Sequence, residues 1–319
     1  MKRVYIYIIF SILTLLLCFL AINVGAVDIS NWTASDKYIL YQIRIPRTLM
    51  CLLSGATLAV CGAAYQSVFE NPLADPYVIG VSSGASFGAA LGIVIGLDCF
   101  ILGVPLLAFI VAMITVAVIM KISQVGGHLH TTTLLLAGIS INFLFAAIIS
   151  ILMFANREEM HKIYFWTMGS FEGIKYIDCI IVFIFSLIGI VAILCFSKQL
   201  NALLLGSMQA NSLGVDSEKV KKRVLVFSTL MTSVVVSFCG VIGFVGLVVP
   251  HIVRLLVGND NRCVVPISIF GGMIFMLLSD IISRALFPPA ILPIGAITSL
   301  IGAPFFIYLL YNAKKKLHF

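Results

Sequence analysis

The residue types that carry enzymatic chemistry are scattered in this chain rather than grouped. The sequence holds no G-x-x-x-x-G-K-[ST] phosphate-binding loop and no H-E-x-x-H zinc motif. Among the five histidines only His128 and His130 lie close together, and they flank a short turn between apolar segments. No serine, histidine and aspartate arrangement stands out. We therefore predict a protein that is not an enzyme and holds no metal and no cofactor.

Three arginines, Arg44, Arg47 and Arg284, lie at the ends of apolar segments, on the outer side in the topology given below. Arginine pairs bidentately with carboxylates, so three of them on one face suit the docking of an acidic protein. The alternative is that each side chain simply reaches the membrane surface from its helix end. Acidic residues within the apolar segments are scarce, with Asp280 the main exception, so an ion-coupled relay has little support.

A second polar cluster occupies the longest connecting loop, residues 198–223. Ala210 and the turn residue Gly214 lie there, followed by the basic run Lys219, Lys221, Lys222 and Arg223. A short helix, a turn and a second helix would suit contact with a soluble cytoplasmic subunit. Attraction to anionic lipid is the alternative, and the basic run can serve both purposes.

The composition indicates whether the segments that carry these residues lie in water or in lipid. Of the 319 residues, 61% are hydrophobic and only 10% are charged, whereas a soluble domain carries roughly 25% charged residues. This excludes a soluble enzyme, a disordered chain and a secreted disulfide scaffold. The net charge of +7 then marks the cytoplasmic face of a membrane protein and not a nucleic-acid partner. The apolar run after Lys2 and Arg3 is long enough to span, and we interpret it as a retained first helix rather than a signal peptide.

Ten spans follow from the requirement of about 20 mostly apolar residues per helix. The segment 247–258 holds Pro250, His251 and Arg254 and is predicted to be a short or broken helix, which is tolerated where protein or a cavity surrounds it. With an inside N-terminus, most of the 20 Lys and Arg residues fall inside, which predicts that both termini are cytoplasmic. The predicted spans are 4–25, 48–69, 78–97, 100–120, 134–155, 177–197, 224–246, 247–258, 264–284 and 292–311.

The sequence carries a faint internal repeat. Residues 59–62 resemble 237–240, and the same offset places Pro72 on Pro250 and Gly80 on Gly258. Five spans separate the copies, so the two would run in opposite directions, as in many transporters. Chance similarity between glycine-rich apolar stretches is the alternative. Small residues between 80 and 90 also form a face that lets helices approach closely.

Five short motifs follow one another in order between about residue 40 and residue 312. They are Arg44-Ile-Pro-Arg47, Asn71-Pro-Leu-Ala-Asp-Pro76, Gly80-Val-Ser-Ser-Gly84, Gly243-Phe-Val-Gly-Leu-Val-Val-Pro-His251, and Leu292-Pro-Ile-Gly295 with Gly302-Ala-Pro304. They resemble the motifs of the iron-siderophore and vitamin B12 (FecCD-type) ABC importer permeases. A single motif of this kind is weak, but five in order at compatible spacing are specific.

The resemblance implies an all-α, ten-span type II importer permease with an inverted repeat, formed by one domain over residues 1–319. It implies a dimer with a second copy or a related chain, two cytoplasmic ATPase subunits, and an extracytoplasmic binding protein. It also implies residue roles, with one departure: Gln209 stands where the broader pattern often has an acidic residue. The implied roles are binding-protein docking for Arg44, Arg47 and Arg284, ATPase coupling for Gln209, Ala210 and Gly214, and a cytoplasmic gate at Asn71, Leu73, Thr131 and Thr132.

The resulting hypothesis is a subunit of the bacterial cytoplasmic membrane that moves a ferric siderophore by alternating access, with ATP hydrolysed by another chain. Cobalamin and haem remain alternative cargoes, because the binding protein usually sets specificity. An ion-coupled secondary transporter is the competing class, and it would need ionisable residues along the path. Helix capping is the alternative role for Asn71 and the gate threonines.

Overall fold

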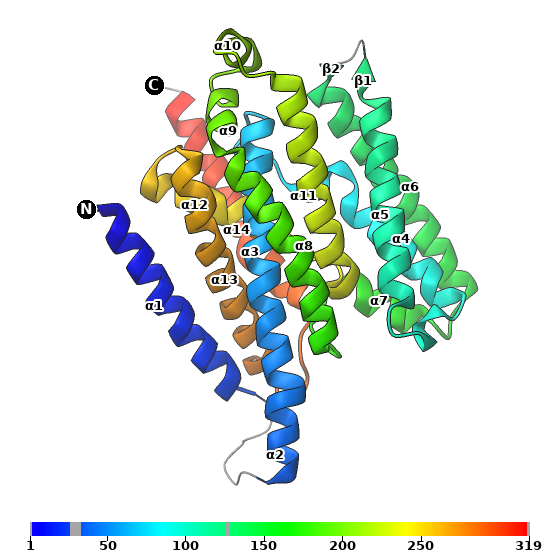
Figure 1. The fold of residues 1–319 in the computed structure, drawn as a ribbon. Coiled ribbons are helices and arrows are strands. Elements are labelled where there is room, and N and C mark those ends of the chain that lie inside the picture. The colour runs from blue at the N-terminus through cyan, green and yellow to red at the C-terminus, as the bar shows by residue number, and fades with distance from the viewer. Residues whose placement is uncertain (1, 26–32, 126–127, 318–319) are drawn as a thin grey trace.

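A computed structural model describes residues 2–25, 33–125 and 128–317, which form a bundle of helices (Figure 1). The long helices cross the bundle from end to end. Short helices and one small hairpin lie at the connections. In chain order the elements are α1 (Lys2–Asn23), α2 (Ala34–Tyr38), η1 (Ile39–Arg44), α3 (Ile45–Val68), η2 (Pro76–Ile79), α4 (Val81–Val94), η3 (Leu97–Cys99), α5 (Gly103–Ile122), β1 (Gln124–Val125), β2 (His128–Leu129), α6 (Thr131–Ala155), α7 (Met160–Thr167), α8 (Tyr176–Cys195), α9 (Ser197–Leu203), α10 (Ser207–Ser212), α11 (Ser217–Cys239), α12 (Val245–Val257), α13 (Asn261–Ala285) and α14 (Ile294–Leu317).

The ten predicted spans each correspond to one apolar helix. Within the described ranges, 7 helices are long and apolar enough to cross a membrane, and shorter apolar helices cover Val81–Val94, Val245–Val257 and Ile294–Tyr308. The short helix predicted around Pro250 is confirmed as α12. We call the two ends of the bundle the α10 end and the α2 end (Figure 1). The first turn of α1 and the last turns of α14 lie toward the α10 end.

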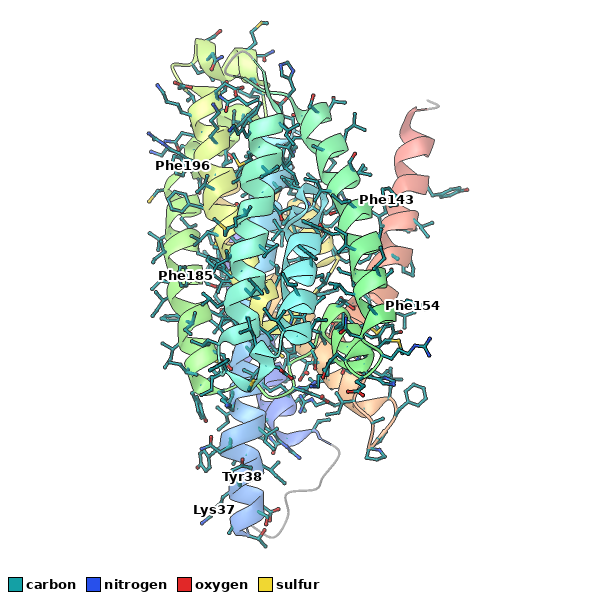
Figure 2. The ribbon with its side chains drawn as sticks, turned by 90° about the vertical axis from the view of Figure 1, so that its right-hand side faces the viewer. Lys37, Tyr38, Phe143, Phe154, Phe185 and Phe196 are labelled. Carbon is teal, nitrogen blue, oxygen red and sulfur yellow. The ribbon has the colours of Figure 1, made fainter. Side chains whose placement is uncertain are left out.

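Two helices begin earlier than the hydropathy predicts. The helical run that contains α3 starts at Ala34, and α11 starts at Ser217 rather than near 224. At both places polar residues lower the local hydropathy without breaking the helix. Asp216 caps α11 by accepting a hydrogen bond from the backbone N–H of Lys219, which satisfies a donor that the helix itself leaves unpaired. Because the other helical run already starts at Ala34, α2 projects beyond the bundle, with Lys37 and Tyr38 near its tip (Figure 2).

The core lies around α3, whose residues are almost all buried from Pro46 onward. It packs against α8, α11, α12 and α13. A methyl group at Gly55 would collide with the carbonyl of Gly272 on α13, and one at Gly62 would collide with the carbonyl of Gly246 on α12. Because apolar lipid gives helices little hydrophobic drive to associate, such close backbone contact supplies much of the packing energy. The tertiary structure therefore depends on glycine at these crossings.

The small-residue face predicted between residues 80 and 90 packs on α5. A Cβ at Gly84 would meet Thr115, and one at Gly88 would meet the backbone of Leu107 and Ala108. The prediction of close helix approach at this face is therefore confirmed.

The arrangement of the repeat is inverted. Helices α3 and α11 contain residues 59–62 and 237–239 and run in opposite directions through the bundle (Figure 1). Gly80 and Gly258, which the same offset relates, both have a positive φ, of 78° and 85°. Each lies just before the next apolar helix, so the two copies place a glycine at equivalent chain reversals.

The outer helices carry unpaired apolar faces. On α6, Phe143 and Phe154 are exposed and project from the bundle (Figure 2). In water such a surface would be unfavourable, whereas in a membrane it is free to meet lipid or another helix. This exposure agrees with the membrane environment that the composition predicts.

Candidate functional site

The predicted gate residues lie together at the α10 end. Asn71, Leu73 and Thr131 line one cavity of about 150 Å³ between the loop after α3 and the start of α6. Thr132 is exposed next to it. The structure thus brings together two segments that are about 60 residues apart in the sequence, and both border the same small space. We call residues 69–75 the gate loop.

The gate loop is shaped by hydrogen bonds between neighbouring residues. The backbone N–H of Leu73 donates to Oδ1 of Asn71 at 2.9 Å, so Asn71 stabilises a turn rather than a helix end. Asp75 accepts from the backbone N–H of Tyr77 at 2.8 Å and caps the short helix η2. Burial raises the pKa of Asp75 to about 6. At the other wall the residue that caps α6 is His130, and its side chain makes no cap bond.

The loop predicted to couple to an ATPase, residues 198–223, protrudes at the α10 end (Figure 1). We call it the coupling segment. Ala210 on α10 is fully buried, Gln209 is exposed, and Gly214 has φ of 81°. The backbone N–H of Val215 donates to the carbonyl of Ala210, and that of Ser217 donates to Oδ1 of Asn211. These bonds tie α10 to the first turn of α11.

Three exposed apolar side chains on the coupling segment were not predicted. Leu205, Met208 and Leu213 are 60%, 81% and 64% exposed, although the segment lies outside the apolar helices. Single exposed apolar residues are ordinary, but three within nine positions form a contact surface. The sequence does contain a signal for them, because these apolar residues lie within a polar loop, at positions that no core helix can bury.

A partly buried polar cluster around Arg254 also escaped the sequence analysis. The guanidinium of Arg254 on α12 donates to Oγ of Ser67 at 2.9 Å and to Oδ1 of Asn261 at 3.1 Å. Asn201 on α9 donates to Asp260 and accepts from the backbone N–H of Asn261, each at 2.7 Å. The cluster therefore joins the coupling segment to α3, α12 and α13. Because the partners lie in distant parts of the chain, sequence spacing gives no indication of it.

The three predicted docking arginines lie together near the α2 end, but they are buried, with 5–6% of each residue exposed. Arg47 and Arg284 both pair with Asp280, at 2.7 Å each. Arg44 donates to the carbonyls of Ile22 and Asn23 at the end of α1. The alternative role, in which each side chain reaches the membrane surface from its helix end, therefore does not hold, and docking of an acidic protein stays a prediction.

The last turn of α1 explains much of this arrangement. Arg284 donates to the carbonyls of Ala21 and Val24, so it completes the same helix end that Arg44 caps. A helix leaves its last carbonyls without partners and carries negative partial charge there, which favours cations. The arginines thus fasten α1 to α3 and α13.

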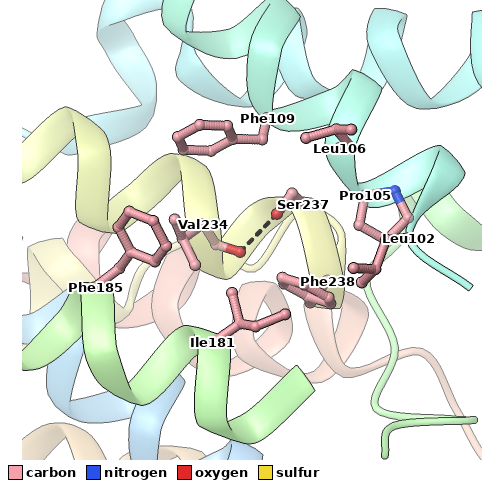
Figure 3. A pocket seen from close by; sticks show the side chains of 9 residues that line it. All are labelled: Leu102, Pro105, Leu106, Phe109, Ile181, Phe185, Val234, Ser237 and Phe238. Carbon is pink, nitrogen blue, oxygen red and sulfur yellow. Dashed lines mark hydrogen bonds between the residues drawn. The ribbon is translucent and has the colours of Figure 1, made fainter. Parts of the chain in front are cut away.

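A separate, almost wholly apolar pocket of about 160 Å³ lies between α5, α8 and α11 (Figure 3). Phe109, Phe185 and Phe238 line it, and the hydroxyl of Ser237 is turned to the carbonyl of Val234. It shares no residue with the cavity at the gate loop. Because its polar group is already satisfied, this pocket offers no directional contacts to a polar ligand.

The bundle and its two polar ends define a multi-pass transport permease. The chain belongs to the FecCD transport family, which matches residues 6–312, and the prediction from the motifs is confirmed. It is 39% identical to the cobalamin import system permease protein BtuC of Halobacterium salinarum, over 87% of this chain and 74% of that protein. It is 34% identical to the hemin transport system permease protein HmuU of Yersinia pestis, over 98% of each.

Solved structures agree with this assignment. A metal-chelate type ABC transporter in an inward-facing conformation has a TM-score of 0.86 and 32% identity, over 95% of this chain and 97% of that one. PsaBC of Streptococcus pneumoniae has the same fold at a TM-score of 0.62 and 18% identity, over 85% and 92%. The fold is therefore that of the type II ABC importer permeases, as predicted.

Proposed function

We propose that this protein is the membrane-spanning subunit of an ATP-driven importer for a bulky metal chelate, and that it makes and breaks no covalent bond itself. The observation that carries the proposal is the α10 end, where a protruding segment with an exposed apolar surface is joined to a small cavity between two walls. Such an arrangement suits a conduit whose opening is driven by another protein.

The driving protein is proposed to be a pair of ATPase subunits at the α10 end, which would then be cytoplasmic. Leu205, Met208 and Leu213 offer the apolar contact, and exposed basic residues such as Lys219 and Arg223 surround it. Interfaces with an apolar centre and a charged rim are typical of stable association between soluble domains. Both chain termini would lie on this side, in agreement with the excess of Lys and Arg residues.

An extracytoplasmic binding protein is proposed to dock on the opposite, α2 end. Arg44, Arg47 and Arg284 lie there, so an incoming carboxylate would have to compete with Asp280 for the last two. A second permease chain, either a copy or a relative, is proposed to complete the path. Exposed apolar residues on α6 are available for that contact or for lipid.

The cargo is proposed within the class of metal chelates. The motifs led to ferric siderophore as the first candidate, with cobalamin and haem as alternatives. The names of the two relatives above, which refer to cobalamin and hemin, support testing these tetrapyrrole chelates first. A large chelate held by few charged side chains would be released easily, which is what a conduit requires.

The competing secondary transporter lacks a suitable ionisable group at its best candidate position. Asp280 is fully buried and already bound by two arginines, so a coupling ion would have to displace both. This observation favours an ATP-driven importer over a secondary transporter.

Purification of the tagged chain from mildly solubilised membranes tests the proposal. We expect ATPase subunits to co-purify at equal stoichiometry, and vesicles with the complex to take up cobalamin, haemin or ferric siderophore only with ATP. A chain that purifies alone and moves a chelate on an ion gradient would refute the ATP-driven function. The substitution Met208→Glu should abolish co-purification, whereas Lys162→Glu at the other end should not.

A further inference from the structure

The coupling segment contacts both walls of the cavity at the gate, through two different acidic side chains. One contact reaches Glu70 in the gate loop. The other starts from Glu218 in the first turn of α11 and reaches Leu129, two residues before Thr131. Neither glutamate belongs to the motifs that identified the family.

The first contact is a chain of three polar groups. The hydroxyl of Ser207, at the start of α10, lies 3.2 Å from Oε1 of Glu70, and Nζ of Lys221 lies 2.6 Å from that hydroxyl. Nζ of Lys221 is also 4.0 Å from Oε1 of Glu70. The Lys221 side chain is only 12% exposed, whereas that of Glu70 is 38% exposed, so the lysine end of this pairing is shielded from water and the carboxylate end is not.

The backbone at Glu70 adds an independent reason to assign it a role. Its φ is 51°, in the left-handed region that non-glycine residues enter rarely, because the Cβ comes close to the following carbonyl oxygen there. The position directly follows the end of α3 at Phe69, where glycine is the usual residue. The chain thus accepts an unfavourable backbone at the one position of the gate loop whose carboxylate meets the coupling segment.

The second contact reaches the other wall. The backbone N–H of Leu129 on β2 donates to Oε2 of Glu218 at 2.9 Å. Leu129 is partly buried against the core, and α6 begins at Thr131. A displacement of α11 at its first turn would therefore pull or release the chain that leads directly into the gate threonines.

Both contacts start from one rigid unit. The hydrogen bonds of Ala210 and Asn211 tie α10 to the start of α11, so Ser207, Lys221 and Glu218 move together. Their targets are next to residues that line a single cavity, since Glu70 lies between Phe69 and Asn71, and Leu129 lies two residues before Thr131. One movement of α10 would thus act on both sides of the cavity.

We propose that Glu70 and Glu218 are positioning residues that transmit the movement of α10 separately to the two walls of the gate. This inference rests on the proposed function, because it requires an ATPase that moves the coupling segment. Glu70 controls the gate loop through Ser207 and Lys221, and Glu218 controls the start of α6 through Leu129.

Hydrogen–deuterium exchange on the complete transporter, reconstituted with its ATPase and binding protein, tests the proposal without knowledge of the cargo. Exchange is compared with and without ATP plus vanadate, in residues 69–75 and 129–135. Glu70→Gly should cut the nucleotide-dependent change at least about fivefold in 69–75 only, and Glu218→Ala should do so in 129–135 only. The fivefold threshold is the lower end of the usual coupling between two sites.

Matched variants separate this effect from misfolding. Glu70→Gly relieves the left-handed backbone, so the thermal midpoint should not fall, while Glu218→Gln keeps an acceptor for Leu129 and should restore the wild-type response. Lys219→Ala removes an exposed ion pair with Asp216 on the same segment and should leave both walls responsive. A doubly substituted Glu70→Gly, Glu218→Ala complex whose two walls still respond as in the wild type would overturn the linkage. A wild-type complex that shows no ATP-dependent change in either wall would instead overturn the proposed function, and the linkage with it.

Discussion

Asp280 offers the sharpest test of how the α2 end is held together. Its carboxylate is fully buried and lies 2.7 Å from Nε of Arg47 through one oxygen and 2.7 Å from a terminal nitrogen of Arg284 through the other. The substitution Asp280→Asn keeps the shape of the side chain but removes its charge. It would also turn an amide N–H₂ toward one guanidinium, where donor would face donor.

The expected loss of stability in this variant follows from the burial of the two arginines that pair with Asp280. Arg47 and Arg284 are almost as inaccessible as Asp280, so neither can recover its lost interaction by turning to water. Removing one partner of a buried ion pair costs about 3–5 kcal/mol, because an uncompensated charge stays in the interior. Arg284 retains its hydrogen bonds to the end of α1. Most of the loss of stability therefore comes from Arg47, whose charge is left without a partner.

Thermal unfolding of the purified protein in detergent, together with a denaturant titration, measures this cost. We expect Asp280→Asn to lower the free energy of unfolding by about 3–5 kcal/mol. Combining it with Arg47→Met should recover part of the loss, since the second change removes the stranded cation. Lys162→Met at the exposed pair with Asp98 is the control, and it should cost less than about 1 kcal/mol.

The reasoning is wrong if Asp280→Asn stays within about 1 kcal/mol of the wild type, the level of an exposed pair. It is also wrong if Arg47→Met adds to the loss instead of offsetting it, because a double-mutant cycle of this kind isolates the interaction between the two side chains.

Three further predictions concern packing, pH and docking. Gly62→Ala should lower the thermal midpoint strongly because its methyl group would meet the backbone of Gly246, whereas Gly92→Ala, with its nearest neighbour at 3.5 Å, should be almost neutral. The pKa of Asp75 is raised to about 6 by burial, so its stabilising contribution is complete below the ordinary value of 3.8 and is lost as the pH rises through 6. Hydrogen exchange of residues 71–79 should therefore show the segment less stable at pH 7 than at pH 5 by about 1 kcal/mol, and Asp75→Asn should remove this difference; an unchanged pH dependence in that variant would exclude the assignment. Met208→Ser should weaken binding of the ATPase at least tenfold by removing about 1.4 kcal/mol or more of apolar contact, measured by titration of the purified subunits, and equal affinity would show that the apolar surface is not the docking site.

The sequence by itself determined the spans, the short helix at Pro250 and the family. Spanning helices can be predicted from short stretches of sequence, because in lipid the backbone groups find hydrogen-bond partners only within their own helix. The number of consecutive apolar residues therefore predicts whether a segment spans the membrane. Asn71 and Thr131, which the resemblance to the family suggested as gate residues, do line one cavity, and their role as a gate stays a prediction. Glycine-rich segments indicated close helix approach, although not which helices meet.

Only the tertiary structure decided which polar groups meet inside the bundle. Arg47 and Asp280 are separated by 233 positions, Glu70 and Ser207 by 137, and Leu129 and Glu218 by 89. Hydropathy records how apolar a helix is, but not how it is rotated about its axis or which helix lies beside it. For that reason the arginines, which we expected at the surface, turned out to be buried around one carboxylate. The contacts of Ser207 with Glu70 and of Glu218 with Leu129 likewise exist only because packing places α10 and the start of α11 against two distant loops.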